Sequence, residues 1–358
     1  MSVISIVMLV FTVVGAVDYL TGNHLGVGKE FERGVLMIGT MILSMVGMIV
    51  LAPLIATLME PALKVVSDKL PFFEPSVIAG SLLANDMGGA PLAYELARTE
   101  TAGYFNGLVV GSMMGATISF SLPLALGVTQ PRQRNSIMLG LMCGIAAIPV
   151  GCIVSGLMLR MPLRELAMSV IPLVLISAVL TVGLLKIPRI CIRIFNVFGQ
   201  IIKVIIIVGL LVGIAEFALN LNIPHTAPVE EGVMVCFNAA VVMTGAFPLL
   251  ALISRLIKKP MGAISRRVGL NEVSALGFIG TLATNVTTFG MMENMDDKGV
   301  VLNSAFAVSA AFTFAGHLAF TMSFNESYML PVIVGKLVAG IFAVVVARFM
   351  YGKMQKKA

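Results

Sequence analysis

The sequence predicts an all-α polytopic membrane protein built from two inverted five-segment repeats, each with a broken or re-entrant segment, joined by a linker helix. Three observations support this prediction. Apolar residues fill 58% of the 358 positions and charged residues only 12%, and the mean hydropathy is +1.00, far from the balance of a soluble domain. The chain also divides into apolar segments of membrane-spanning length, and two of these segments carry similar polar interruptions.

Each apolar segment is bounded by glycines, prolines and charges. A helix needs about 20 apolar residues to cross the hydrocarbon core of a bilayer. We expect the first segment to be a retained span, because it has neither a basic leader nor a small-residue cleavage site. The eleven segments are Ser2–Leu20, Gly34–Met59, Ser76–Leu96, Tyr104–Gly127, Asn135–Leu159, Leu166–Leu185, Ile194–Leu219, Gly232–Ile257, Val273–Met292, Val300–Ser323 and Met329–Tyr351.

The third and ninth segments are interrupted by the polar runs 80–89 and 280–290, centred on Asn85 and Asn285. Non-helical backbone at membrane depth is stable only where it lines a cavity or is buried in protein. Paired breaks in the two halves of a chain indicate the binding site of a transporter. We therefore expect substrate to bind at these breaks, with Asn85 and Asn285 close enough to share one ligand.

A weak internal repeat relates the two halves. Sliding the chain along itself aligns Gly34 with Gly232, Gly47 with Gly245 and Ser76 with Ser274, and slightly different offsets align Asn85 with Asn285 and Asn106 with Asn303. The matches keep the same order along both halves, which favours a duplicated architecture over chance similarity. The predicted division is a first transmembrane repeat at 1–163, a linker helix at 164–190 and a second repeat at 191–358.

Loop charges predict the orientation of these repeats. Basic residues concentrate in four places: Arg132 and Arg134, the 186–193 connection, the 255–267 connection and the C-terminal tail. If both broken segments dip into the membrane and return, all four lie on one side, which the positive-inside rule makes cytoplasmic. That topology has nine crossings, an outward N-terminus and a cytoplasmic C-terminus.

Other functional classes find little support. The net charge of +6 is carried by connections and the tail, with no basic face suited to nucleic acid. The four cysteines lack metal-ligand spacing and the three histidines are scattered, so we expect no metal and no cofactor. An intramembrane hydrolase would need a nucleophile with a base or paired catalytic aspartates, and a structural or sensory subunit would need no paired breaks.

Asp86 is the first candidate for substrate binding. A carboxylate at membrane depth costs at least about 2.5 kcal/mol, and such groups are usually functional. The alternatives are that Asp86 caps the turn or pairs with Lys336, although Lys336 could also extend outward to the membrane surface. Asn85 and Asn285 carry amides that suit a substrate hydroxyl or could instead tie broken helix ends together.

Helix-borne polar residues complete the candidate set. Ser112 and Asn303 could line a path, although hydroxyls often bond back to helix carbonyls. His317 could relay protons because its charge changes near neutral pH. A neutral, hydrogen-bonded histidine is the alternative for His317.

The chain resembles the ethanolamine permeases encoded in bacterial ethanolamine-utilisation operons. The resemblance extends over nearly the whole sequence, and one difference is Gly316, where the family often has an acidic residue before the histidine. The similar runs are Leu82-Leu83-Ala84-Asn85-Asp86-Met87-Gly88-Gly89, Gly111-Ser112-Met113-Met114-Gly115, Phe289-Gly290-Met291-Met292 and 303–312.

The resemblance implies a permease, not an enzyme, that imports ethanolamine across the bacterial cytoplasmic (inner) membrane. This small ammonium with one hydroxyl would suit a carboxylate such as Asp86, the two amides, and an aromatic face such as Phe289 or Phe120. An ion-coupled transporter of another small amine or metabolite is the alternative. Coupling to Na⁺ or H⁺ and assembly as a homo-oligomer stay open from the sequence.

Overall fold

The computed structural model describes residues 3–70, 72–128 and 130–355, and every regular element in this part of the chain is helical. The expected all-α class is confirmed. A helix satisfies its backbone hydrogen bonds within the segment, which is what an apolar sequence requires in lipid. Within these described residues, seven stretches are long and apolar enough to cross a membrane: Gly28–Leu63, Glu100–Ala125, Arg134–Met158, Leu163–Lys186, Pro188–Leu219, Val229–Leu256 and Gly316–Gln355.

The helices match the predicted segments in order. The first half contains α1 (Val3–Leu20), α2 (Gly28–Met41), α3 (Gly47–Lys69), α4 (Ser76–Leu82), α5 (Gly89–Leu96), α6 (Glu100–Tyr104), α7 (Leu122–Val128) and α8 (Arg134–Met158). The second half, after α9 (Leu163–Lys186), contains α10 (Pro188–Leu219), α11 (Val229–Val268), α12 (Glu272–Ala283), α13 (Asn285–Met291), α14 (Asp297–Ala310), α15 (Gly316–Asn325) and α16 (Met329–Gln355).

Wider π-helical turns lie in two of the long helices, at η1 (Ile42–Val46), η3 (Phe105–Gly115) and η4 (Thr117–Ser121). Every residue of η3 is buried. This segment therefore forms the centre of the molecule, packed against α4, α5, α8, α14 and α16.

Both predicted breaks interrupt their helices. Helix α4 ends at Leu82, and the short turn η2 (Asn85–Met87) leads through Gly88 to α5. Gly88 has a φ of +85°, which favours glycine, and a side chain there would also collide with Met48. In the second half, Thr284 is extended between α12 and α13.

A third break was not predicted. The segment Val300–Ser323 was expected to be one continuous helix, and this expectation is wrong, because 311–315 separate α14 from α15. Phe312 has a φ of 58°. The N–H groups of Phe312 and Phe314 donate to the carbonyls of Thr281 and Leu282, both at 3.1 Å. The broken end of α12 and the third break thus satisfy each other's backbone groups.

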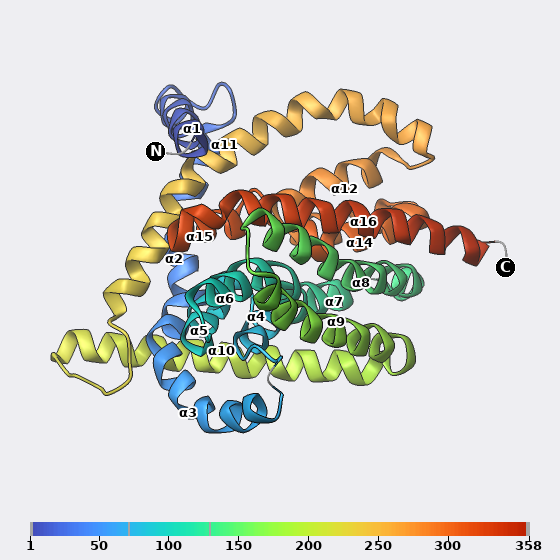
Figure 1. Ribbon diagram of the computed structural model, residues 1–358. Helices are drawn as coiled ribbons and strands as arrows, with labels where there is room; N and C mark the ends of the chain where they lie inside the picture. Colours follow the sequence, from blue (N-terminus) through green and yellow to red (C-terminus); the bar gives the residue numbers. More distant parts are fainter. Residues whose placement is uncertain (1–2, 71, 129, 356–358) are drawn as a thin grey trace.

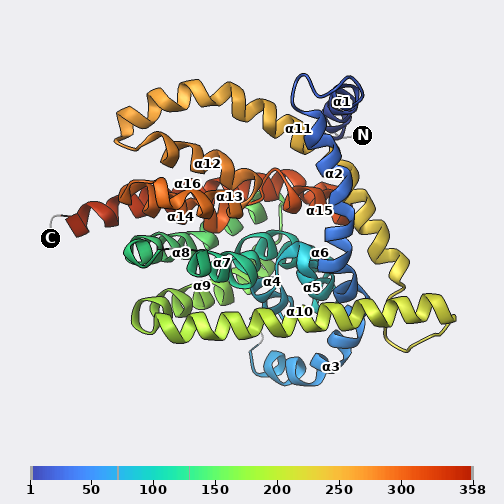
Figure 2. The ribbon, with the colours of Figure 1, turned by 180° about the vertical axis from the view of Figure 1, so that it is seen from behind.

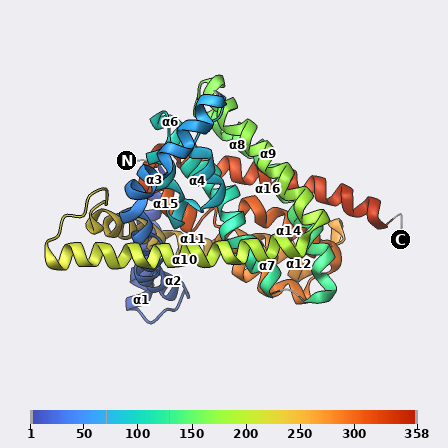
Figure 3. The same ribbon diagram turned by 90° about the horizontal axis from the view of Figure 1, so that it is seen from below.

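Helices from the two halves interleave. Helices α8, α9, α10 and α16 run across the view of Figure 1, whereas α2 and the first part of α11 cross them, and Figure 2 shows the same arrangement from behind. Helix α1 packs on α11, α10 packs on α3, and α2 packs along α11. The view from below shows α10 lying across the molecule (Figure 3).

Several basic connections lie at one end of the molecule. The C-terminus, the α9–α10 turn with the exposed residues Lys186 and Arg189, and the α11–α12 turn all lie to the right in Figure 1 and to the left in Figure 2. The α10–α11 connection and the α15–α16 junction lie at the opposite end. The stretch 255–267, expected to be a loop, is helical within α11. The side chains of its basic residues Lys258, Lys259, Arg266 and Arg267, and the tail residues Lys356 and Lys357, lie outside the described part of the structure.

Candidate functional site

A cavity of about 400 Å³ lies where the three breaks meet. The first break contributes Ala84, Asp86 and Met87, the second contributes Ala283, Thr284 and Val286, and the third contributes Phe312, Ala315, Gly316 and His317. The rest of the wall comes from α2 and η1, from the stretch 116–120 and from α11. Its residues are Arg33, Met37, Thr40, Met41, Ser44, Met45, Ala116, Phe120, Met243 and Phe247. The lining is therefore mainly apolar, and Asp86 is its carboxylate.

Asp86 lies on the short turn η2 and is 24% exposed, toward the cavity. Its Oδ1 atom lies 3.7 Å from Nε2 of His317. A Cβ on Gly316 would lie 3.2 Å from its Oδ2 atom. The acidic partner of the histidine, which this chain lacks at position 316, is therefore supplied by Asp86 from the other half of the molecule.

His317 connects Asp86 to a buried lysine. Nδ1 of His317 lies 3.1 Å from Nζ of Lys336, which also donates to the carbonyl of Ser112 at 2.5 Å. The backbone N–H of Ala116 donates to the carbonyls of Gly111 and Met113 and not to that of Ser112. The wide helical turn thus leaves the Ser112 carbonyl as an acceptor for Lys336. Lys336 is fully buried, and the expectation that it extends to the membrane surface is wrong.

Aromatic rings form one side of the cavity. Phe120 and Phe312 meet edge to face with their centroids 5.6 Å apart, and Phe312 lies 4.9 Å from the His317 ring. The guanidinium of Arg33 lies 4.8 Å from the centroid of Phe247. Phe289, expected to contact substrate, is only 2% exposed and is absent from the cavity lining, whereas Phe120 lies on it.

The two break asparagines are fully buried behind the cavity wall and not on it. The Asn85 amide donates to the carbonyl of His317 at 3.5 Å, and the Asn285 amide donates to the hydroxyl of Ser121 at 2.5 Å. The structure therefore gives the two amide nitrogens different protein partners. Each asparagine ties its own break to a helix of the opposite half.

Ser112 and Asn303 lie in the packed interior. The Ser112 hydroxyl bonds back to Val109 at 3.0 Å, so its carbonyl, and not its hydroxyl, reaches the site. The Asn303 amide donates to the carbonyls of Ser274 and Gly299 at 2.8 and 2.9 Å. The cavity thus brings together Asp86 and His317, with the other predicted polar residues as supports around them.

Comparison with known proteins decides the family. The family model described as "Ethanolamine utilisation protein, EutH" matches residues 1–350. A probable ethanolamine permease from Listeria monocytogenes is 38% identical over 356 residues, covering 99% of this chain and 95% of the relative. The Escherichia coli protein of the same name is 35% identical, covering 98% and 95%. A Bacillus subtilis protein called uncharacterized protein YxeR is 32% identical, covering 96% and 93%.

The chain belongs to the EutH family. The resemblance seen in the sequence is therefore confirmed. No solved structure matches the chain. Its relatives are named as permeases, and this EutH-family chain is a multi-pass membrane protein and not an enzyme.

Two aromatic contributors to the EutH-family cavity, Phe312 and Phe247, were missed in the sequence, and Lys336, considered there as a partner of Asp86, lies behind the cavity wall. Phe312 and Phe247 fall in apolar runs where an aromatic residue carries no signal of its own. Lys336 did carry a signal, because a charge two turns inside an apolar segment usually faces the protein interior. Its partners could not be found from the sequence, since Ser112 and His317 lie on other helices.

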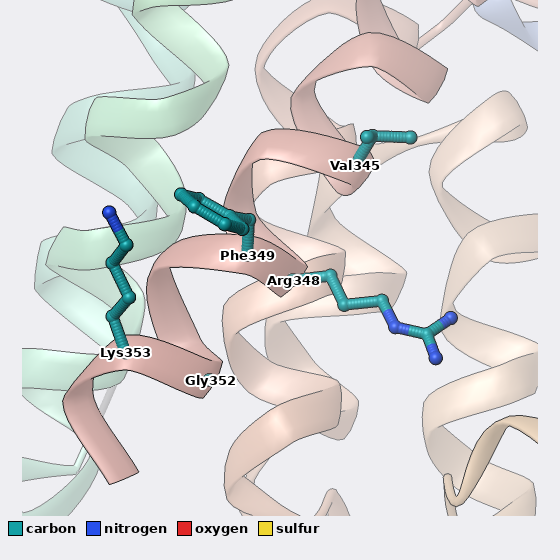
Figure 4. A pocket seen from close by; sticks show the side chains of 5 residues that line it. All are labelled: Val345, Arg348, Phe349, Gly352 and Lys353. Atoms are coloured by element: carbon teal, nitrogen blue, oxygen red, sulfur yellow. The ribbon is translucent and has the colours of Figure 1, made fainter. Parts of the chain in front are cut away.

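A second hollow lies on the outside of α16 near the C-terminus of this EutH-family chain (Figure 4). It is lined by Val345, Arg348, Phe349, Gly352 and Lys353. The Lys353 ammonium lies 4.4 Å from the Phe349 ring centroid. Two cations on its wall disfavour a cationic ligand. The hollow on α16 is therefore a poor site for an amine, whereas the cavity at Asp86 offers a carboxylate at the meeting point of the three breaks.

Proposed function

We propose that this protein imports ethanolamine, as ethanolammonium, across the bacterial cytoplasmic membrane, and that the substrate binds at Asp86. One observation carries the proposal: a carboxylate lies on the wall of an apolar, aromatic-lined cavity where the helix breaks of both halves converge. Permease names among close relatives support the same substrate.

The chemistry of the cavity suits this cation. An ammonium group has three donors and needs a counter-charge, which Asp86 supplies. The face of Phe120 or Phe312 offers cation–π attraction to the same end of the molecule. The hydroxyl of Thr284, on the second break, is a polar partner for the substrate hydroxyl.

Inverted repeats form part of the proposal. A Cβ on Gly34 would collide with the backbone of Thr244, and one on Gly232 would press on Val46. Position 232 lies 198 residues after position 34, and position 244 lies 198 residues after position 46. The two contacts therefore join equivalent positions of the two halves with their roles exchanged, as expected for halves related by a pseudo-two-fold axis. The exchange supports two repeats that meet at their breaks.

A second pair of contacts obeys the same relation. Gly47 of α3 packs against the carbonyl of Ile206 in α10, and Gly245 of α11 packs against the carbonyl of Met8 in α1. The first apolar segment of each half thus packs on the second apolar segment of the other half. Rocking of one repeat against the other would expose the cavity alternately to the two sides.

Orientation follows from charge. The end that carries Lys186, Arg189 and Lys353 is assigned to the cytoplasm by the positive-inside rule. Arg348 and Lys353 would there contact anionic lipid headgroups. With this assignment the C-terminus is cytoplasmic.

Uptake by the purified full-length protein in liposomes tests the proposal. We expect saturable uptake of labelled ethanolamine at acidic pH, well above that of protein-free vesicles, and competition by unlabelled ethanolamine. A panel of other small amines, added as competitors, tests the alternative substrates. Uptake no faster than in protein-free vesicles would overturn the proposed function, and stronger competition by another amine would reassign the substrate.

A further inference from the structure

Lys336 is a buried charge that ammonium binding at Asp86 does not itself require. It is 0% exposed, and its described hydrogen-bond partners are the Ser112 carbonyl and Nδ1 of His317. A buried lysine without a carboxylate in direct contact is expensive in a membrane protein and usually functional. Its nearest carboxylate, Asp86, is reached through the imidazole of His317.

The contacts from Lys336 through His317 to Asp86 have a donor end and an acceptor end. When Lys336 is charged, its ammonium is a donor only, so Nδ1 of a neutral His317 accepts and the ring proton lies on Nε2. Nε2 faces Oδ1 of Asp86 at 3.7 Å, a gap that side-chain movement can close on substrate binding. A proton held at Lys336 in the interior is thus connected through one imidazole to the cavity wall.

The charges around the site balance before substrate enters. Asp86 and Lys336 carry opposite charges, and Arg33 on the cavity wall pairs with Glu30 at 3.4 Å. Cys152 of α8 is the other titratable group that faces Lys336. An entering ethanolammonium adds a second cation beside a single carboxylate. Such an excess charge is strongly unfavourable in a buried site, and losing a proton from the site removes it.

We propose that Lys336 is a proton-binding site and that the protein exchanges one ethanolammonium for one proton. This inference rests on the proposed function. Nζ of Lys336 gives a proton to Nδ1 of His317, and Nε2 of His317 gives its proton to water in the cavity. Only N–H and O–H bonds change: neutral Lys336, neutral His317 in its other tautomer and a hydronium ion result.

The exchange of tautomer also builds the binding site. Before the transfer, Nε2 of His317 is a donor and repels an ammonium group. After the transfer, Nε2 is an acceptor beside Oδ1 of Asp86 and can receive a second N–H of the substrate. The site is therefore complementary to ethanolammonium only when the proton has left. Transport is then electroneutral and responds to a pH gradient, not to membrane potential.

Calorimetric titration of the purified protein with ethanolamine in buffers of different ionisation enthalpy counts the protons. At about pH 6, where free ethanolamine is protonated, we expect release of about one proton per molecule bound. Lys336→Met should bind ethanolamine and release none. Lys336→Arg keeps a permanent charge and should lose binding. Lys353→Met, a lysine substitution on the exposed face of the same helix, is the matched control and should behave like the wild type.

The wild-type result alone can overturn the inference, whatever the variants' folding yield. Binding without proton release would reject proton exchange while leaving the proposed function intact. An absence of binding and uptake would instead reject the proposed function itself. Proton release that persists in Lys336→Met would assign the proton to another group and also overturn the inference.

Flux in liposomes supplies the second measurement. With a potassium diffusion potential set by valinomycin, initial uptake by the wild type, after subtraction of protein-free vesicles, should not change with the imposed potential. Uptake by Lys336→Met should increase when the interior is made negative, because the substrate charge then moves alone. Potential-driven uptake by the wild type would contradict proton exchange.

Discussion

The two predicted breaks share a sequence pattern but differ in chemistry. Gly80-Ser81-Leu82 and Gly280-Thr281-Leu282 each lead, three residues later, to a fully buried asparagine. Each asparagine donates to a helix of the opposite half. The next residue is Asp86 in the first break and Val286 in the second, and both lie on the cavity. The supporting structure is thus duplicated, whereas the charge that selects a cation is present once.

The difference indicates how a symmetric framework acquires a directional site. The first break carries the carboxylate, and the second half supplies His317, which faces it, and Lys336, which contacts His317 from behind. A single substitution in either break should therefore have unequal effects. Four experiments address that inequality, from the largest expected effect to the smallest.

Asp86→Asn should reduce ethanolamine uptake at least about 100-fold, because removal of one partner leaves a buried cation uncompensated. Uptake into liposomes at acidic pH measures the loss. Glu95→Gln, an exposed carboxylate at the end of the same segment, is the control and should keep near-normal uptake. A well-folded Asp86→Asn protein with wild-type uptake would remove Asp86 from the site.

Moving the charge to the other break should fail. In the double variant Asp86→Val, Val286→Asp, the cavity regains a carboxylate on the second break. His317, with Lys336 behind it, then lacks the carboxylate at position 86. We expect uptake to stay at least about tenfold below wild type. Recovery to within about threefold would mean that a carboxylate anywhere on the cavity wall suffices, and would end the functional distinction between the breaks.

Replacing Asn85 or Asn285 by alanine should lower the stability of the protein by similar amounts but reduce ethanolamine uptake by different amounts. Each alanine variant removes one hydrogen bond and should lower stability by about 1 to 3 kcal/mol. Asn85→Ala also loosens Asp86 and His317 and should reduce uptake about tenfold, whereas Asn285→Ala should reduce it less. Because their partners differ, the stability losses should add in the double variant. Thermal unfolding in detergent measures this, and strong non-additivity would indicate a shared network.

Aromatic substitutions should give the smallest effect. Phe120→Leu removes a ring from the cavity and should raise the KM for ethanolamine roughly fivefold through lost cation–π attraction. Phe289→Leu, at a buried position off the cavity, should leave KM unchanged. Concentration-dependent uptake distinguishes the two, and an equal rise in both variants would indicate a packing effect.

The sequence predicted the elements better than their contacts. Apolar segment length and the Gly and Asn punctuation located the helices and two of the breaks, because these features act locally. The break at 311–315 was not predicted, because the backbone N–H groups of Phe312 and Phe314 find their hydrogen-bond acceptors in α12, about 30 residues earlier in the chain. Asp86 and His317 were identified by their rarity in an apolar chain, but their pairing depends on packing between the halves.

The buried position of Lys336 also constrains how the protein is made. Lys336 lies two turns inside α16, and a lysine at the centre of a span would oppose insertion by about 2.5 to 3.5 kcal/mol. The partners of Lys336 belong to earlier helices, so they are synthesised before α16. Order of synthesis thus places the acceptor groups before the charge that needs them, and α16 brings its lysine to partners that have already been made.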